Sequence, residues 1–308
     1  MLINNIYNTV PRNLAALLLL ICVGSSPVWG QTVNDHQVQA EIDAANKQVQ
    51  RIMDRFRPHM TATQQAAVAG RRVRVIPMAD FNAFVDYQRR EILVPMQLVA
   101  EIAAQLEAMI LVIRDPALQA TYGRWLEHVR LRSESARSRF FAGQTIVDDV
   151  PFRAFWQFAG IASPAQFTSL ERDTFWGGVD DALGLIIGHE LGHLFLGHMP
   201  YSQITPEQSR AQEYAADEYA RKIMGDAERF VFAGLVTFFA RFVEAESWET
   251  GRSANGNTHP PAKCRIYRIG ASELKMWSDK LDAGALKQRF SSVGDIERLL
   301  AEWRADCE

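Results

Sequence analysis

This sequence of 308 residues lacks a strong charge excess, internal repeats and, beyond its start, long apolar runs. Its formal net charge of −3 does not indicate nucleic-acid binding, so no nucleic acid is expected as a partner. A later apolar run, residues 230–240, has eleven residues between two arginines. A membrane-spanning helix needs about 20 residues. We therefore expect a globular protein with no transmembrane domain in its mature chain.

The first thirty residues have the pattern of a secretory signal peptide. Their start carries one arginine and no acid, an apolar run follows at 14–23, and the small residue Gly30 marks a cleavage position. The run is about half as long as a spanning helix, which favours cleavage over a membrane anchor. Cys22 follows two bulky residues, which disfavours lipid attachment. We expect a bacterial protein that is periplasmic or secreted.

Cysteine is scarce: the chain has three, and removal of the signal peptide would leave only Cys264 and Cys307. In the oxidising compartment that export implies, the two can form a disulfide that ties the C-terminal tail to the segment around Cys264. The alternative is a pair of buried free thiols.

Hydrophobic periodicity predicts a mainly helical α+β fold with a small β-sheet. Two short β-branched segments that end at prolines, 73–77 and 92–95, predict strands. Helical spacing covers 38–56, 97–142 with a break at 114–116, 179–198, 206–224 and 229–248.

The segment IIGHELGHLFLGH, at 186–198, holds three of the seven histidines. On a helix, His189 and His193 share a face, so two imidazole nitrogens can converge on one zinc ion. Glu190 can then act as the general base of a hydrolysis. His198 is five residues from His193, about 140° around the helix, and cannot join the site while the helix continues. Two core histidines on an ordinary buried helix are the alternative.

A third metal ligand must come from another segment. A three-histidine site of the metzincin type fails, because Met199 stands where its third histidine would be. The segment AQEYAADEYARKIM offers Glu213 and, four residues later on the same helical face, Asp217. Such a pair can supply one oxygen to zinc and one acceptor for the other nitrogen of a ligand histidine.

The strings HELGH at 189–193 and EYAAD at 213–217 together resemble the gluzincin class of zinc metallopeptidases. Within that class, EYAADEYA, THPPAKCRI and NAFVDYQRREILVP resemble segments of the HtpX and CAAX prenyl endoprotease family. They occur in the same order, between residues 82 and 266. The resemblance implies a zincin-type metallopeptidase domain with one Zn²⁺ per chain.

The resemblance also implies roles for single residues. Glu213 would be the third zinc ligand, and Asp217 would orient a ligand histidine from behind it. His259 and Arg265 would stabilise the oxyanion or fix the site; a salt bridge between the active-site helices is the alternative for Arg265. The strand at 92–95 would be an exposed edge along which a peptide substrate lies.

Two features depart from the family. Spanning helices are missing after the signal peptide, so a lipidated or intramembrane substrate is not expected. The distance from the strand at 92–95 to the metal motif is long, which implies a helical insertion at about 97–178 within a single domain over 31–308. Its aromatic-rich part, 143–178, would form packed short helices or a lid.

These features together predict a zinc metalloendopeptidase that hydrolyses exported proteins that are unfolded or misassembled. One alternative is a zinc-stabilised binding or chaperone-like protein, although structural zinc needs four closed ligands and no base. The other is a latent peptidase that is autoinhibited by its insertion.

Overall fold

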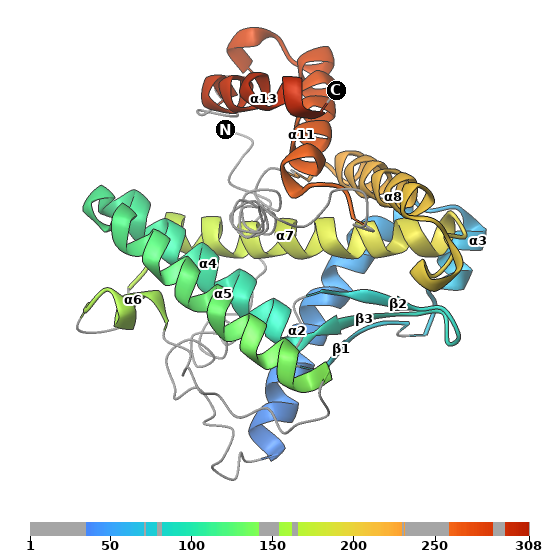
Figure 1. The fold of residues 1–308 in the computed structure, drawn as a ribbon, viewed down its shortest axis with the longest axis horizontal. Helices are drawn as coiled ribbons and strands as arrows, with labels where there is room; N and C mark the ends of the chain where they lie inside the picture. The colour runs from blue at the N-terminus through green and yellow to red at the C-terminus, as the bar shows by residue number, and fades with distance from the viewer. Residues whose placement is uncertain are drawn as a thin grey trace. The chain divides into compact units, whose positions relative to one another are not determined.

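The computed structural model describes residues 35–70, 72–78, 82–141, 154–161, 166–229, 231, 259–285 and 293–307. Over these residues the protein is mainly helical with one three-stranded sheet, which confirms the predicted fold class (Figure 1). The expected signal peptide lies outside the described residues, as does nearly all of the helix predicted at 229–248.

The chain divides into two compact units, each built from separate stretches of sequence. The single domain over 31–308 stays a prediction, and the described residues of the expected insertion belong to unit 1. Unit 1 comprises Met1–Met53, Val73–Phe84 and Leu93–Asp180; unit 2 comprises Asp54–Arg72, Val85–Ile92 and Asp181–Glu308.

Helices α4 (Met96–Arg114) and α5 (Gln119–Phe141) lie side by side in unit 1 (Figure 1). They are separated at Asp115, which caps the short helix η2 (Pro116–Leu118), so the predicted break is confirmed. The four-residue helix α6 (Phe155–Phe158) packs against both. Their shared core consists of Ala104, Ala108, Leu111, Trp125, Leu126, Val129 and Phe155.

Helix α4 is also the one helix among the described residues that is long and apolar enough to cross a membrane. Of its most apolar window, 67% is buried inside the protein. Buried core helices meet the same criteria of length and composition, and α4 carries the buried polar side chains Glu101, Gln105 and Glu107.

The sheet has the strand order β1-β3-β2 and corrects one prediction. Its strands are β1 (Val73–Ile76), β2 (Phe84–Asp86) and β3 (Glu91–Pro95). The strand at 92–95 is central, so its assignment as an exposed edge is wrong; the edges are β1 and β2. All four residues from 92 to 95 are buried, as expected for a continuous apolar run covered on both faces.

The first helix, α2 (Asp35–Phe56), agrees with the segment predicted at 38–56. It is followed by two short helices, η1 (Arg57–His59) and α3 (Ala62–Ala67). The capping box that begins α3 joins the side chains and backbone of Thr61 and Gln64.

Helix α7 (Ser169–Phe195) is longer at its start than the sequence predicted. The sequence predicted this helix only from residue 179, but Gly178 lies inside it. A Cβ on Gly178 would lie 2.7 Å from the side chain of Leu106 on α4, so the missing side chain allows close packing. Helix α7 ends three residues before His198, at a turn in which Gly197 has φ of 68°.

Unit 2 is completed by η3 (Tyr201–Gln203), α8 (Pro206–Asp226), α11 (Ala262–Lys280) and α13 (Val293–Cys307). Helix α8 agrees with the segment predicted at 206–224. A capping box formed by Thr205 and Gln208 begins it. Helix α11 packs against both α8 and α13.

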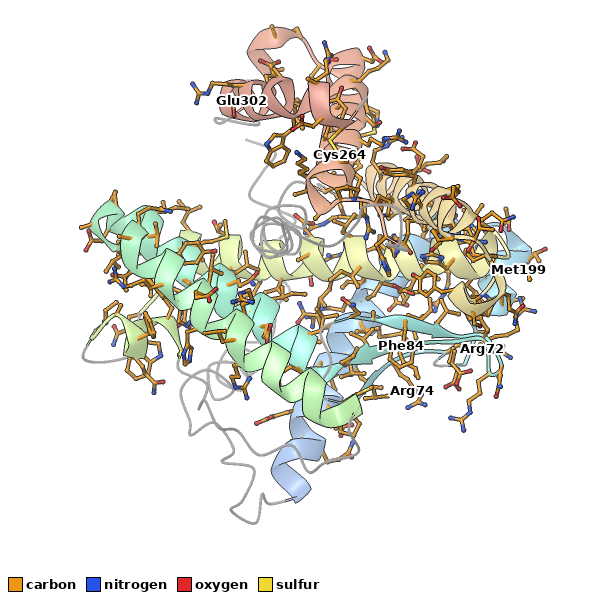
Figure 2. All side chains as sticks on the ribbon, in the orientation of Figure 1. Arg72, Arg74, Phe84, Met199, Cys264 and Glu302 are labelled. Atoms are coloured by element: carbon orange, nitrogen blue, oxygen red, sulfur yellow. A yellow bond between two sulfur atoms is a disulfide. The ribbon has the colours of Figure 1, made fainter. Side chains whose placement is uncertain are left out.

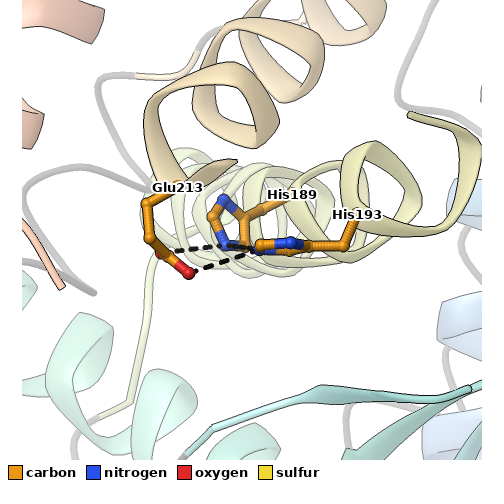
Figure 3. A group of neighbouring side chains, drawn as sticks. All are labelled: His189, His193 and Glu213. Atoms are coloured by element: carbon orange, nitrogen blue, oxygen red, sulfur yellow. Dashed lines mark hydrogen bonds and ion pairs between the residues drawn. The ribbon is translucent and has the colours of Figure 1, made fainter. Parts of the chain in front are cut away.

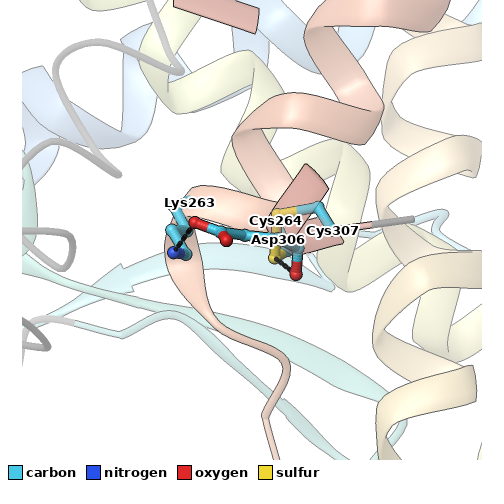
Figure 4. The surroundings of a disulfide bond; sticks show 4 residues. All are labelled: Lys263, Cys264, Asp306 and Cys307. Atoms are coloured by element: carbon cyan, nitrogen blue, oxygen red, sulfur yellow. Dashed lines mark hydrogen bonds and ion pairs between the residues drawn. A yellow bond between two sulfur atoms is a disulfide. The ribbon is translucent and has the colours of Figure 1, made fainter. Parts of the chain in front are cut away.

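A disulfide between Cys264 and Cys307 joins the first turn of α11 to the end of α13, as the sequence analysis expected (Figure 4). Beside it, Lys263 forms an ion pair of 2.6 Å with Asp306. Figure 2 shows Cys264 at the α11 side of this connection. The disulfide anchors the turn of α11 that carries the neighbouring residue Arg265.

Helices α7 and α8 approach closely at two glycines. A Cβ on Gly192 would lie 2.8 Å from Cα of Ala216, and one on Gly188 would lie 3.1 Å from Cα of Ala220. Real Cβ atoms essentially never approach another atom to 2.8 Å, and the atom in the way is backbone. The backbone of α8 therefore needs glycine at 192.

Replacement of Gly192 by alanine is expected to lower the free energy of unfolding by about 1–3 kcal/mol, because the new methyl group pushes α8 away. Denaturant unfolding measures this loss. Gly123→Ala is the matched control, since a Cβ at this exposed position inside α5 meets nothing within 4 Å. It should stabilise by about 0.5–1 kcal/mol through helix propensity. A stabilising Gly192→Ala would contradict the close packing.

Candidate metal centre

Two histidines of α7 point to one place. His189 and His193 lie one helical turn apart, and their Nε2 atoms are 3.0 Å from each other (Figure 3). Both side chains are largely buried, with 13% and 6% of their surface exposed. The structure thus brings together the two ring nitrogens that the sequence predicted as metal ligands.

Helix α8 brings Glu213 to the same place. Its Oε2 lies 3.4 Å from Nε2 of His189, and its Oε1 lies 3.4 Å from Nε2 of His193 (Figure 3). In a tetrahedral zinc site with bonds of about 2.0–2.1 Å, neighbouring donor atoms are separated by roughly 3.3 Å. The spacing of these three donors fits such a site, so this buried group could bind a metal ion.

The electrostatics of Glu213 agree with a cation site. Burial would raise the pKa of Glu213, but hydrogen bonds with the two histidines and the charge of Arg265 hold it well below its usual range. Burial would lower the pKa of His189, but its bonds to Asp217 and Glu213 raise it to about 10. The carboxylate of Glu213 is therefore ionised, as a metal ligand must be.

Asp217 and Arg265 form the layer behind the ligands. Asp217 Oδ1 lies 2.9 Å from Nδ1 of His189, on the side of the ring away from the other ligands. The guanidinium of Arg265 donates two hydrogen bonds, of 2.7 and 2.8 Å, to the Asp217 carboxylate. It also lies 3.3 Å from Oε2 of Glu213. Arg265 thus links α11 to Glu213 and Asp217 of α8.

Glu190 is buried beside this group, with 9% of its surface exposed. It is not one of the three converging ligands. Burial raises its pKa to about 7, while the positive charge of His189 and a backbone hydrogen bond from Val85 in β2 act in the opposite direction. A carboxyl group with a pKa near neutrality suits proton transfer at physiological pH.

Tyr201 is a site residue that the sequence analysis missed. Its hydroxyl donates a hydrogen bond of 2.6 Å to Oε1 of Glu213 and lies 3.1 Å from Nε2 of His259. The side chain of His259 is 47% exposed, so this pair forms the open side of the group. The sequence offered only one weak signal for this role, which is a tyrosine a few residues after the metal motif.

His198 also lies at the site, because α7 ends before it. Gly197 adopts a left-handed conformation, and the backbone N–H of His198 donates to the carbonyl of His193 at 3.1 Å. The two Nδ1 atoms of these histidines are 2.9 Å apart. Burial lowers the pKa of His198 to about 4, with further lowering from the charges of His193 and His189.

The structure therefore gathers all the residues that the sequence singled out for this site in unit 2. The three candidate ligands His189, His193 and Glu213 are surrounded by Glu190, Asp217, His259 and Arg265. The structure also places Tyr201 and His198 at the site, and both belong to the segment that follows α7. Figure 2 shows Met199, which lies between them in the chain, at the end of α7.

Comparison with known proteins gives one match. A family model described as Peptidase U49 matches residues 134–279, a span that contains the whole group from His189 to Arg265. No curated protein and no solved structure matches the chain significantly. The match indicates a peptidase family, whereas the finer resemblance to HtpX and the CAAX prenyl endoproteases stays a prediction.

Proposed function

We propose that this protein is a zinc-dependent endopeptidase. The observation that carries the proposal is the convergence of two imidazoles and a carboxylate at tetrahedral spacing, with a second carboxylate beside them that is not a ligand. A structural zinc site would have four protein ligands and no adjacent base. The peptidase family match over the same residues supports hydrolysis of a peptide bond.

A zinc ion held by His189, His193 and Glu213 would acidify a water and polarise the carbonyl of the scissile bond. Glu190 would take the proton from the attacking water on its carboxylate and deliver it to the nitrogen of the leaving amine. Its burial keeps bulk water away from that proton and raises its pKa toward the working pH.

The remaining polar groups divide between two roles in this proposal. Arg265 holds Asp217 and Glu213 in place, since its guanidinium is buried and bonded to both. Tyr201 and His259 lie on the open side, where they could stabilise the oxyanion of the tetrahedral intermediate. The Tyr201 hydroxyl would have to redirect to the oxyanion the one proton that it donates to Glu213 in this structure. Both roles agree with the alternatives that the sequence analysis left open for His259 and Arg265.

The substrate would be an extended segment of an unfolded or misassembled exported protein. Strand β2 is an edge of the sheet, and its residue Val85 bonds to Glu190. A peptide that pairs with β2 would therefore pass the general base, held by main-chain hydrogen bonds. The disulfide supports an oxidising compartment, and with the expected signal peptide we propose the periplasm or the exterior.

The test is hydrolysis of unfolded casein by the protein from residue 31, with metal content measured on the same samples. We expect about one zinc per chain, loss of cleavage when a chelator removes it, and recovery with one equivalent of zinc. Cleavage that persists without metal would contradict the zinc mechanism. Bound zinc without cleavage would favour the binding-protein or autoinhibited alternative.

A further inference from the structure

The metal group has a second layer that treats its two histidines differently. His189 faces the carboxylate of Asp217, whereas His193 faces the imidazole of His198. Both contacts are 2.9 Å long and both use the Nδ1 atom of the ligand histidine. Outer partners of this kind fix the ring orientation and the tautomer of a metal-binding histidine.

The contact between His198 and His193 follows from the way α7 ends. When a helix closes with a left-handed glycine, the N–H of the residue after the glycine bonds to the carbonyl of the residue four positions before the glycine. Here Gly197 is the glycine, and the N–H of His198 donates to the carbonyl of His193. This backbone bond brings the two residues together, and their ring centroids are 4.8 Å apart.

The protons of the two rings can be assigned from chemistry. A neutral imidazole that binds a metal through Nε2 carries its proton on Nδ1. His193 must then donate from Nδ1, and His198 must accept with its own Nδ1 and keep its proton on Nε2. His198 cannot be replaced here by a group that lacks an acceptor.

We infer that His198 is a positioning residue that holds His193, through an Nδ1–H···Nδ1 hydrogen bond, in the orientation and tautomer needed to bind the metal. The inference rests on the proposed function, because it assumes that His193 is a metal ligand. His198 would thus have the same orienting role toward His193 that Asp217 has toward His189. His189 has an anionic partner and His193 a neutral one, so the two ligands differ in basicity.

The test measures zinc dissociation constants by competition with a fluorescent chelator, for wild type, His198→Leu and His198→Asn. Asparagine can place its side-chain oxygen where Nδ1 of histidine was, whereas leucine has no acceptor. We expect His198→Leu to weaken zinc binding by about 10–100-fold and His198→Asn to stay close to wild type. Leu196→Asn is the matched control, because Leu196 is exposed on the same turn.

A third variant keeps the inference testable if the leucine variant does not fold. His198→Asp offers an anionic acceptor, so it should bind zinc more tightly than His198→Asn. Circular dichroism of the metal-free proteins verifies folding. Equal zinc affinity in wild type and His198→Leu, or weak binding by the asparagine and aspartate variants, would overturn the inference alone. A wild type that binds no zinc would overturn the proposed function as well.

Discussion

Replacement of Glu190 by glutamine is expected to lower kcat/KM for an unfolded protein substrate by about 10³-fold while the metal stays bound. General acid–base catalysis contributes about 10²–10⁴-fold, and glutamine has nearly the same shape but cannot take up the proton of the attacking water. The metal should remain, because Glu190 is not one of the three converging ligands. Initial rates and metal content, measured on the same preparation, separate the two effects.

Glu207→Gln is the matched control for this substitution. Glu207 lies in the first turn of α8, and its side chain is 71% exposed, so loss of its charge should leave activity unchanged. A Glu190→Gln variant that keeps most of its activity would remove the general-base role. A variant that loses its metal would show that Glu190 acts on the site rather than on the substrate.

The same variant should also change stability in a pH-dependent way. In the metal-free protein, burial raises the pKa of Glu190 from 4.5 to about 7. Because this folded-state pKa is raised, the charged carboxylate lowers stability as pH rises from about 4.5 to 7, and the full cost remains above pH 7. Metal-free Glu190→Gln should therefore be more stable than wild type at pH 8, by up to about 3 kcal/mol. At pH 4 the two should unfold alike.

The elements that sequence predicted well are those with strong local signals. Helices α2, α4, α5 and α8 show helical periodicity, and a capping box with a proline in the first turn marks the start of α8. The convergence of these side chains was predictable because His189 and His193, and likewise Glu213 and Asp217, are four residues apart on their helices. Periodicity of this kind depends on the neighbouring residues and not on the rest of the fold.

The predictions that failed or were missed depend on tertiary packing. The helix of the metal motif was predicted to begin at 179, yet Gly178 provides room for Leu106 inside a continuous helix that begins earlier. The central position of β3 depends on which strands pair, which its own sequence does not specify. The sequence of β3 does contain an unbroken apolar run. Such a run indicates burial on both faces, which favours a central strand.

The contact of His198 with the site could not be found from helical spacing. The 140° between His193 and His198 applies only while the helix continues, and the helix ends at Phe195. The useful signal was Gly197 directly before His198, because a glycine after a helix favours the left-handed closure that folds the chain back. Tyr201 reaches Glu213 through the same change of direction.

Replacement of Arg265 by methionine is expected to lower the free energy of unfolding by about 3–5 kcal/mol, because removal of one partner leaves buried charges uncompensated. The side chain of Arg265 is 11% exposed and those of Asp217 and Glu213 are 6% and 1% exposed. Denaturant unfolding of the metal-free protein measures the loss. Arg57→Met is the control: its ion pair with Asp54 is exposed on both sides, so at most about 1 kcal/mol should be lost.

A double-mutant cycle identifies the cause of that loss. Asp217→Asn removes one of the two buried charges that Arg265 compensates, so Arg265→Met should cost less in the Asp217→Asn background than in wild type. Additive losses would mean that Arg265 contributes through packing instead.

The two roles considered for Arg265, fixing the site and stabilising the oxyanion, are separated by which measured quantity changes in the variant. A residue that fixes the site lowers stability and metal affinity together, whereas an oxyanion donor lowers kcat in a protein that is otherwise intact. Since the guanidinium is buried and bonded to both carboxylates, we expect the first pattern for Arg265 and the second for Tyr201→Phe.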